Sequence, residues 1–486
     1  MNYKMVLSIL GKVLVIEAIL LLFPMLVGII YEEQTLYAFL IPVLGLLAVG
    51  MPLSFFRVKD GAMYAKEGFV TVALAWIIMS LVGAVPFVLS GEITSYIDAL
   101  FETVSGFTTT GASILSAAQI DGMSKSLMFW RLFTHWIGGM GILVFVLAIV
   151  PNAGAGAMHV FRTESPGPSV GKLVSKLSRT AKILYGIYLF MTLLEMTILL
   201  CSGLPFYDSL LLSFTTAGTG GFSIKSTNAV EYSSFVQIVL SVFMFLFAVN
   251  FNTYYLILIG QVRKAFLSEE VRIYFITVLV ATVAVALNIF FAANNLVSSF
   301  GDALKQSFFQ VASITSTTGL ASADFNYWPE FSQGILMMLT IIGACGGSTG
   351  GGMKFARVII LGKSTSSDFK RLIHPRAIVT SKFEGEPIDK DTIRNVKTYF
   401  VLWFVIVVVC MFLLTFDNYT NLFEDLSATL ACIGNVGPGF GVVGPMGSYA
   451  GYNGFSKLIL SAVMLIGRLE IFPILLLFAP HTWRRG

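Results

Sequence analysis

The stretch FTTTGAS at residues 107–113 recurs in altered form three more times along the chain. The other copies are TTAGTGGFS at 215–223, TSTTGLAS at 315–322 and GNVGPGFG at 434–441. Each copy follows an acidic or polar start and an apolar stretch that is too short to cross a bilayer. This pattern predicts a half-helix that enters the membrane and a Gly-rich loop that returns to the same side.

The four copies share one spacing and one orientation. Aligned on Gly111, Gly220, Gly319 and Gly437, they are 109, 99 and 118 residues apart. The spacing predicts a unit of helix, half-helix, Gly loop and helix that occurs four times. Each unit crosses the membrane an even number of times, so all four units have the same orientation. This arrangement differs from the inverted repeats of many secondary transporters.

The composition is that of a helical membrane protein. Of the 486 residues, 56% are hydrophobic and 12% are charged, and the mean hydropathy is +0.82. A soluble globular protein has about 25% charged residues. These values exclude a soluble multidomain enzyme, a disordered chain and a nucleic-acid-binding protein. Long apolar runs, rather than short alternating strands, exclude an outer-membrane barrel. We therefore expect an all-α polytopic membrane protein.

Ten membrane spans are predicted, because a span needs about 20 apolar residues. The predicted spans are 11–30, 36–56, 68–90, 127–150, 182–202, 235–260, 271–293, 333–361, 398–416 and 456–480. The segments between them alternate in charge. One side holds most of the Lys and Arg, and the other holds 14 Asp and Glu but only four Lys, at 125, 225, 305 and 457. The positive-inside rule then places both termini in the cytoplasm.

A half-helix followed by a Gly loop has a specific use for cations. Its inner end leaves four carbonyl groups unpaired and is the negative pole of the helix dipole. The returning backbone has to line a cavity or be buried in protein. Rings of backbone carbonyls that replace an ion's hydration shell form potassium filters. Four such loops would close one pseudo-fourfold ring around a central pore. The other interpretation, four ordinary extracellular loops, does not account for their common register.

A further Gly-rich segment, 343–354, interrupts a predicted span with the sequence GACGGSTGGGMK. Each Gly inside a helix costs up to about 1 kcal/mol relative to Ala, so a continuous helix is not expected. Unwound backbone at this depth has to line a cavity or be covered by protein. We therefore interpret the segment as an unwound loop inside the membrane. The other interpretation is helix packing through small residues, which uses Gly at a spacing of four rather than consecutive Gly.

Ionisable residues inside the predicted spans are costly and mark a pathway or a pair. They are Glu17, Arg131, His135, Glu195, Lys354, Arg468 and Glu470. Arg468 could mark an ion pathway or be a member of a structural ion pair. Glu470 is not expected to be its direct partner, because residues two apart on a helix do not face each other. Arg131 and His135, one turn apart, are expected to support the filter by hydrogen bonds. Glu17 and Glu195 are expected to be packing residues with satisfied carboxylates rather than ion sites.

These motifs, with WRLFTHWIGGMGI at 130–142, CGGSTGGGMK at 345–354 and GRLE at 467–470, give the chain a family resemblance. Over nearly its whole length it resembles the Trk/Ktr superfamily of microbial potassium transporters, most closely the TrkH/TrkG type. The resemblance implies a potassium-channel-like fold, with two N-terminal spans and four helix–pore-helix–helix repeats around one pore. The expected units are 1–62 for the N-terminal spans and 63–165, 166–265, 266–375 and 376–486 for the repeats.

The resemblance also assigns residues to a filter and a gate. The filter prediction, with a glycine ending each triplet, is Thr109, Thr110 and Gly111; Gly218, Thr219 and Gly220; Thr317, Thr318 and Gly319; Asn435, Val436 and Gly437. The gate prediction is Gly346, Gly347, Gly350, Gly351, Gly352, Lys354 and Arg468. The fourth loop departs most from the others, and its Pro438 stiffens the turn. We therefore expect a less symmetric filter, with weaker selectivity than four identical loops would give.

The predicted function is potassium uptake across the bacterial cytoplasmic (inner) membrane, with potassium as the substrate and no covalent cofactor. The chain has no Walker A motif, because Arg357 stands where Gly is needed before Gly362, Lys363 and Ser364. By the resemblance, a cytosolic TrkA-like ring binds the regulatory nucleotide, NAD or ATP, and the chain forms a homodimer in the lipid bilayer. The basic stretch 362–397 could dock this ring or only enforce orientation.

An intramembrane enzyme and a coupled secondary transporter are the two other classes of function for such a chain. An intramembrane enzyme would need a motif such as HExxH or GxSG, and the sequence contains neither. A cation-coupled secondary transporter for an organic solute would have its broken helices in inverted pairs. Potassium symport with protons or sodium is the alternative that stays open, because the residues are compatible with a channel and with a coupled transporter.

Overall fold

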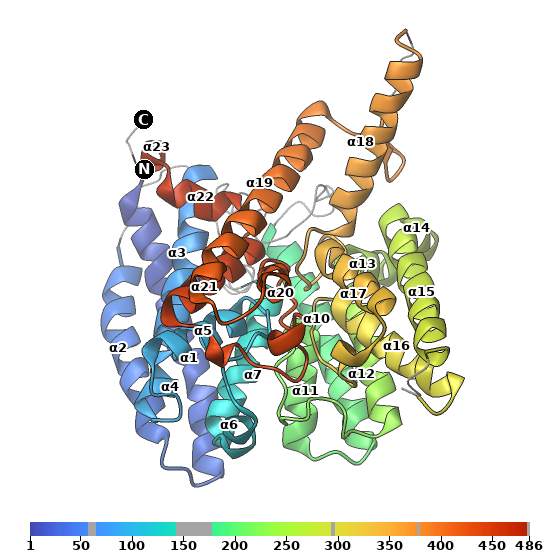
Figure 1. Ribbon diagram of the computed structural model, residues 1–486. Helices are drawn as coiled ribbons and strands as arrows, with labels where there is room; N and C mark the ends of the chain where they lie inside the picture. The colour runs from blue at the N-terminus through green and yellow to red at the C-terminus, as the bar shows by residue number, and fades with distance from the viewer. Residues whose placement is uncertain (57–64, 142–176, 293–296, 377–379, 484–486) are drawn as a thin grey trace.

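The computed structural model describes the whole chain except residues 57–64, 142–176, 293–296, 377–379 and 484–486. Figure 1 shows helices that stand side by side, with both termini at one end of the molecule, here called the terminal face. Among the described residues, six helices are long and apolar enough to cross a membrane, and a bent pair of helices would make a seventh. The predicted all-α polytopic fold is confirmed.

The chain begins with a close pair of helices, α1 (Tyr3–Ile30) and α2 (Leu36–Ser54). Glycines bring the two backbones together. A Cβ atom built on Gly11 of α1 would lie 2.5 Å from the backbone nitrogen of Ser54, and one built on Gly50 of α2 would lie 3.0 Å from the Gly11 oxygen. The pair packs against the rest of the molecule through contacts of α1 with α3 (Ala65–Gly83) and α7 (Lys125–Gly139), and of α2 with α4 (Val85–Leu89).

Four successive units follow, each with a long first helix, a short pore helix, a loop and a second helix (Figure 1). The first helices are α3 (Ala65–Gly83), which continues into α4 (Val85–Leu89), α10 (Leu177–Cys201), α15 (Glu269–Phe290) and α19 (Lys390–Leu414). The pore helices are α5 (Tyr96–Phe107), α11 (Phe206–Gly218), α16 (Phe300–Thr315) and α20 (Leu422–Ile433). The second helices begin as α7 (Lys125–Gly139), α12 (Ser234–Phe247), α17 (Glu330–Ile342) and α21 (Gly454–Arg468).

Short elements complete the described chain. They are α6 (Ala117–Gly122), α14 (Val262–Leu267), the 3-10 turns Phe325–Tyr327, Thr415–Asp417, Gly441–Val443 and Tyr449–Gly451, the strands β1 (Lys382–Phe383) and β2 (Glu386–Pro387), and α23 (Pro480–Trp483). The two strands pair antiparallel in a small hairpin between α18 (Phe355–Ile373) and α19. Figure 1 shows α18 projecting far beyond the other helices on the side of the terminal face.

The acidic start of each sequence repeat is the first turn of a pore helix. Asp98, Asp208, Asp302 and Glu424 all occupy this turn. A negative charge there is favourable, because the N-terminus is the positive pole of the helix dipole. Side chains of Ser95, Ser299 and Asn421 also cap three of these helices by accepting backbone N–H groups. The repeated acid therefore marks where each half-helix begins.

The second helices break, and the sequence predicted this only in part. The predicted break at 343–354 is confirmed, because α17 ends at Ile342 and α18 begins at Phe355. The predicted spans 235–260 and 456–480 are not continuous helices. Helix α12 bends by 88° into α13 (Phe251–Leu258), and α21 is followed by Leu469–Ile471 and then α22 (Phe472–Phe478). The last part of the predicted span 127–150 lies outside the described residues.

Local chemistry explains both unexpected breaks. The first break lies between α12 and α13. There the Asn250 side chain accepts the backbone N–H of Asn252 at 2.9 Å and so caps the N-terminus of α13. In the second, Glu470 and Ile471 have φ values of 61° and 68°, which an α-helix does not contain. Pro473 then stands in the first turn of α22, where its missing N–H costs nothing.

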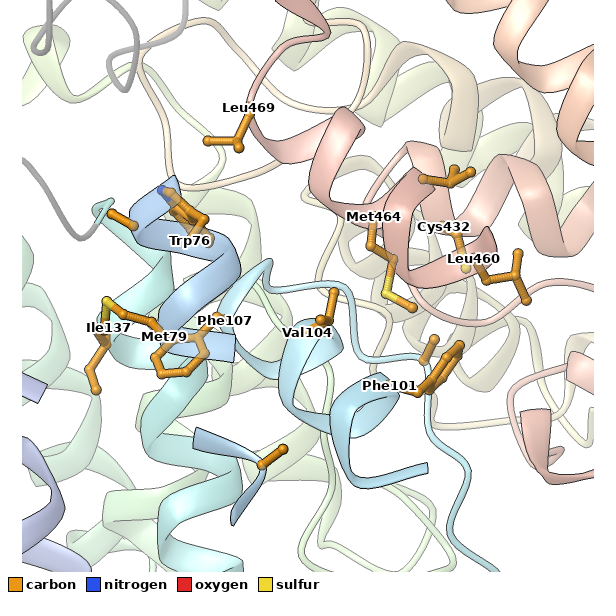
Figure 2. Packing of buried hydrophobic residues seen from close by; sticks show 14 of the residues in the cluster. Trp76, Met79, Phe101, Val104, Phe107, Ile137, Cys432, Leu460, Met464 and Leu469 are labelled. Atoms are coloured by element: carbon orange, nitrogen blue, oxygen red, sulfur yellow. The ribbon is translucent and has the colours of Figure 1, made fainter. Parts of the chain in front are cut away.

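The first and fourth units meet around the pore helix α5. Figure 2 shows Phe101, Val104 and Phe107 of α5 among apolar side chains of other helices. These neighbours are Trp76 and Met79 of α3, Ile137 of α7, Cys432 of α20, Leu460 and Met464 of α21, and Leu469 just after it. All of them are buried, and α5 contacts α3, α7 and α21. Units far apart in sequence are thereby joined side by side.

The α1–α2 contact leads to a stability prediction. Gly11→Val is expected to lower the free energy of unfolding by about 1–3 kcal/mol, because a larger side chain forces the two backbones apart. Gly45→Val on α2 is the matched control, since no atom lies within 4 Å of its added Cβ, and surface changes of this kind shift stability by about 0.5 kcal/mol or less. Thermal unfolding in detergent measures both. Equal effects of the two changes would contradict the packing described here.

Candidate functional site

The loops after the four pore helices share one backbone conformation. The first residue with a positive φ in each loop is Thr109 (55°), Thr219 (54°), Thr317 (62°) or Asn435 (53°). Two residues later comes a glycine with a positive φ, which is Gly111 (81°), Gly221 (83°), Gly319 (78°) or Gly437 (95°). The residue between them donates its N–H to a carbonyl five residues earlier at 2.8–2.9 Å. The common geometry makes the four loops structural equivalents.

The loops also meet in a closed ring. A Cβ atom built on the glycine of one loop would overlap a carbonyl oxygen of the next loop, closer than real Cβ atoms approach. The four overlaps are Gly111 with Gly220 O, Gly221 with Thr318 O, Gly319 with Val436 O, and Gly437 with Thr110 O. The fourth loop therefore returns to the first. Glycine is required at all four positions by this close approach as well as by its φ.

The ring corrects the sequence alignment of the second loop by one residue. Gly221, and not Gly220, has the conformation and the ring contact of Gly111. Gly218 is the last residue of α11, so it precedes the equivalent triplet 219–221. Gly218 and Gly220 instead leave room for His135, whose backbone oxygen and ring a Cβ at these positions would overlap. Consecutive glycines hid this shift in the sequence.

Arg131 and His135 of α7 connect the first two loops, as the sequence predicted. The His135 Nδ1 atom lies 2.8 Å from the Gly106 oxygen, and its Nε2 accepts the N–H of Phe222 at 3.2 Å. Since Nε2 accepts, the ring is neutral and Nδ1 donates to Gly106. The Arg131 guanidinium donates to the Ser223 oxygen at 3.0 Å. The predicted hydrogen bonds of Arg131 and His135 to this region are present, and the role of the loops as a filter stays a prediction.

Glu102 is a structural residue of this site that the sequence analysis missed. Its buried carboxylate accepts the Nε of Arg131 at 2.6 Å, the hydroxyl of Ser113 at 2.9 Å and the N–H of Ile114 at 3.0 Å. The charge of Arg131 is thereby neutralised beside the loops, and the returning part of the first loop is held. The available signal was an acid one turn after Asp98, in the middle of an apolar half-helix.

Asn435 makes the fourth loop different from the others. Its side-chain Nδ2 donates to the Thr110 hydroxyl and to the Met464 oxygen, both at 3.0 Å. The first loop, the fourth loop and α21 are joined at this point. Asn also adopts a positive φ more readily than the β-branched Thr at the equivalent positions. The fourth loop therefore differs from the other three in this side chain, while its backbone conformation matches theirs.

One cavity lies on each side of the ring. The larger, of about 160 Å³, is lined by all four ring glycines, by Arg131 and by Lys225. The smaller, of about 30 Å³, brings together Gly350, Gly351, Gly352, Lys354 and Arg468 of the predicted gate, with Trp76 and Glu470. Gly346 and Gly347 do not line it. The ring thus separates a larger hollow from a narrow space bordered by the broken second helices.

The segment 343–354 lies directly against the ends of two pore helices. The Gly351 N–H donates to the Thr317 hydroxyl at 2.6 Å. A Cβ built on Gly350 would lie 2.6 Å from the Ser316 oxygen, and one on Gly351 would lie 2.5 Å from the Gly434 oxygen. Lys354, which is buried, donates from Nζ to the Gly350 oxygen. The unwound segment therefore packs beneath the third and fourth loops.

Arg468 connects this segment to the first unit through backbone oxygens. Its guanidinium donates to the Thr349 oxygen at 2.8 Å, to the Gly139 oxygen at 2.9 Å and to the Gly138 oxygen. Glu470 forms an ion pair with Arg357 of α18. The expectation that Glu470 is not the direct partner of Arg468 agrees with this pairing. The cationic side chains of Arg468 and Lys354 border the same narrow cavity.

Glu17 and Glu195 are both buried carboxylates inside helices. Glu17 is fully buried in α1, and neither of its carboxylate oxygens has a hydrogen-bond partner among the described residues. The expectation that it is satisfied was therefore wrong. Glu195 is also fully buried, and neither of its carboxylate oxygens has a hydrogen-bond partner among the described residues, although it lies beside Thr216 of the pore helix α11. The same expectation for Glu195 was therefore also wrong. Neither residue lines the two cavities described above.

Comparison with known proteins places this geometry in a family. A model of the TrkH family, described as cation transport proteins, matches residues 38–485. The Trk system potassium uptake protein TrkH from Salmonella typhimurium is 33% identical over 489 residues, covering 100% of both chains. The Trk system potassium uptake protein TrkG from Escherichia coli is 30% identical and covers 95% of this chain and 94% of its own.

A solved structure agrees with the sequence relatives. The crystal structure of the potassium transporter TrkH from Vibrio parahaemolyticus superposes with a TM-score of 0.88, at 31% identity and 100% coverage of both chains. The likeness includes the whole described helical framework rather than a single motif. The chain therefore belongs to the TrkH family of cation transport proteins.

Proposed function

We propose that this protein takes up potassium ions across a membrane through the ring of four loops. The closed ring of glycines and carbonyl oxygens carries this proposal, because such oxygens can replace the hydration shell of the ion. The four pore helices end beside the ring, so the negative poles of their dipoles favour a cation there. The relatives named as potassium uptake proteins support the choice of ion.

The proposed filter follows the corrected register of the second loop. Its residues are Thr109, Thr110 and Gly111; Thr219, Gly220 and Gly221; Thr317, Thr318 and Gly319; Asn435, Val436 and Gly437. Backbone carbonyls of these triplets are the proposed ligands, and potassium is the only metal ion that the proposal requires. The side-chain asymmetry of Asn435 supports a selectivity weaker than that of four identical loops.

Replacement of Gly221 tests the filter and its register together. Gly221→Ser is expected to reduce the preference for potassium over sodium by roughly tenfold, because its Cβ would displace the Thr318 carbonyl from the ring. Gly122→Ser in α6 is the matched control, since its Cβ meets no atom within 4 Å. Rubidium uptake into proteoliposomes, with competition by potassium or sodium, measures the preference. An unchanged preference in folded Gly221→Ser protein would contradict the proposed filter.

The proposed gate is the segment 343–354 together with Arg468. Its backbone lies against the ends of the third and fourth pore helices, where it narrows the passage below the ring. Two cationic side chains, Lys354 and Arg468, border the remaining cavity of about 30 Å³. A fixed positive charge in a narrow passage raises the energy of a cation in transit. Both features support an obstructed pathway in this conformation.

Shortening the gate segment is expected to open the pathway. Deletion of residues 346–348 should raise rubidium flux in proteoliposomes about tenfold or more, because the backbone then no longer reaches beneath the ring. Arg468→Ala should raise the flux as well, by removing the charge barrier. Excess potassium should still block the flux, which shows that the filter is intact. Unchanged or lower flux through folded, shortened protein would count against the gate.

Orientation and partners belong to the same proposal. The terminal face is the cytoplasmic side of a bacterial inner membrane, which the basic segments at this end support. The repeats occupy 63–165, 166–265, 266–375 and 376–486 after two N-terminal spans in 1–62. The chain forms a homodimer, and a cytosolic TrkA-like ring that binds NAD or ATP regulates it. The projecting α18 supports a docking role for the stretch 362–397.

A gradient experiment distinguishes a channel from a symporter. Channel-like uptake predicts that net potassium flux follows the potassium gradient and the membrane potential alone. Purified protein in vesicles, with and without an opposing proton or sodium gradient, provides the measurement. Potassium movement against its own electrochemical gradient, driven by the proton or sodium gradient, would show symport and contradict the channel.

A further inference from the structure

Both ends of the gate segment are bound to one carboxylate outside it. Glu270, the second residue of α15, is buried and accepts the N–H of Gly346 at 2.6 Å with its Oε1. The same oxygen accepts the N–H of Ala356, at the start of α18, at 3.0 Å. One oxygen atom therefore joins the beginning and the end of the unwound segment. Hydrogen bonds of a carboxylate to backbone N–H groups are among the stronger ones in proteins.

The broken helix of the second unit holds the segment from another side. Asn250 lies 3.4 Å from Glu270 through its Nδ2 and the Oε2 of the acid. The N–H of Phe251 donates to the Gly347 oxygen at 3.0 Å, and the N–H of Cys345 donates to the Ala248 oxygen at 3.1 Å. The gate segment is thus enclosed between α15 and the break that separates α12 from α13.

Glu270 is positioned in turn by the β-hairpin on the terminal face. Glu384, at the hairpin turn, accepts the Ser268 hydroxyl at 2.8 Å and the N–H groups of Glu269 and Glu270 at 3.0 and 3.1 Å. Its carboxylate therefore caps the N-terminus of α15 from another part of the chain. Lys363 of α18 attaches the same hairpin by donating to the Lys382 oxygen at 2.7 Å.

The choice of residue at the hairpin turn indicates that the cap matters. Glu384 has a φ of 51° and Gly385 a φ of 83°, which is the pattern of a type I′ turn. The first position of this turn favours Asn, Asp or Gly, and Glu pays for a positive φ there. An Asn at this position would suit the turn better, but its side chain is one methylene shorter. The turn tolerates Glu while the carboxylate reaches α15.

We propose that Glu270 is a positioning residue that holds the gate segment closed, and that Glu384 of the hairpin keeps Glu270 in place. A displacement of the hairpin on the terminal face then weakens the cap of α15, moves Glu270 and frees both ends of the segment at once. The inference rests on the proposed gate for its effect on ion flow. The positioning of the segment by the two acids stands apart from that role.

Cys345 provides a direct probe of the segment, because it lies within it and is fully buried. In a background with Cys201→Ser, Cys410→Ala and Cys432→Ala, it is the one thiol of the full-length chain. N-ethylmaleimide labelling in proteoliposomes is expected to be about tenfold faster in Glu270→Ala and Glu384→Asn, because the segment loses its anchors. Glu270→Gln, which keeps an acceptor oxygen but no charge, should fall between wild type and Glu270→Ala.

The matched control is Glu386→Asn, which removes an exposed acid from the same hairpin. It should label at the wild-type rate. The hairpin is expected to fold in Glu384→Asn, because Asn followed by Gly is a favoured pair for this turn. A change in labelling of this variant therefore reports the lost carboxylate rather than a misfolded hairpin. Equal labelling of Cys345 in wild type, Glu270→Ala and Glu384→Asn would overturn the proposal. Faster labelling in Glu386→Asn would overturn the part assigned to Glu384.

Rubidium flux measured on the same vesicles separates this inference from the gate itself. The inference expects Glu270→Ala and Glu384→Asn to raise flux several-fold, with no added effect in a chain that lacks 346–348. If the shortened chain conducts faster while the two acid variants label faster but conduct at the wild-type rate, the acids do not control the passage and the inference fails. If the shortened chain shows no increase, the proposed gate fails, and the labelling rates still decide whether the acids hold the segment.

Discussion

Each of the four loops presses a glycine against a carbonyl oxygen of the next loop, and the rest of the structure accommodates this contact. No side chain fits between the loops, so glycine and positive φ are imposed at equivalent places in segments about a hundred residues apart. The backbone there needs partners or a cavity at membrane depth. Glu102, Arg131, His135 and Asn435 provide hydrogen bonds around the ring, and the breaks of the second helices provide space beneath it.

The sequence predicted the features that depend on composition and spacing. Apolar runs, the charge alternation and the repeated Gly loops are sufficient for a polytopic fold with four parallel units. The helix break at 343–354 was predictable to the residue, because six glycines within ten positions cannot continue a helix at a low cost. The register of the second loop was not predictable in this way. Thr219, Gly220 and Gly221 offer two glycines, and only the φ values and the ring contact distinguish them.

Features that arise from tertiary contact had little or no sequence signal. The bend at Ala248–Asn250 contains neither Gly nor Pro, and the break at Leu469–Ile471 places a β-branched residue at a positive φ. Such positions persist because neighbouring elements hold them. Glu102 lies in the middle of a half-helix and Glu270 near the start of a helix, and their buried bonds to distant backbone groups appear only in the folded chain. Arg468 likewise binds carbonyl oxygens contributed by two other units.

The contact of the gate segment with only two of the four pore-helix ends has a mechanical consequence. A pore built from identical subunits widens evenly, like an iris, because symmetry imposes the same motion on every subunit. Here all four units belong to one chain, and the obstruction enters from one side, beneath Ser316 and Gly434. Withdrawal of the proposed gate segment would move backbone away from one side of the passage only. If the proposed gate moves in this way, the passage changes its width while the ring of loops keeps its geometry.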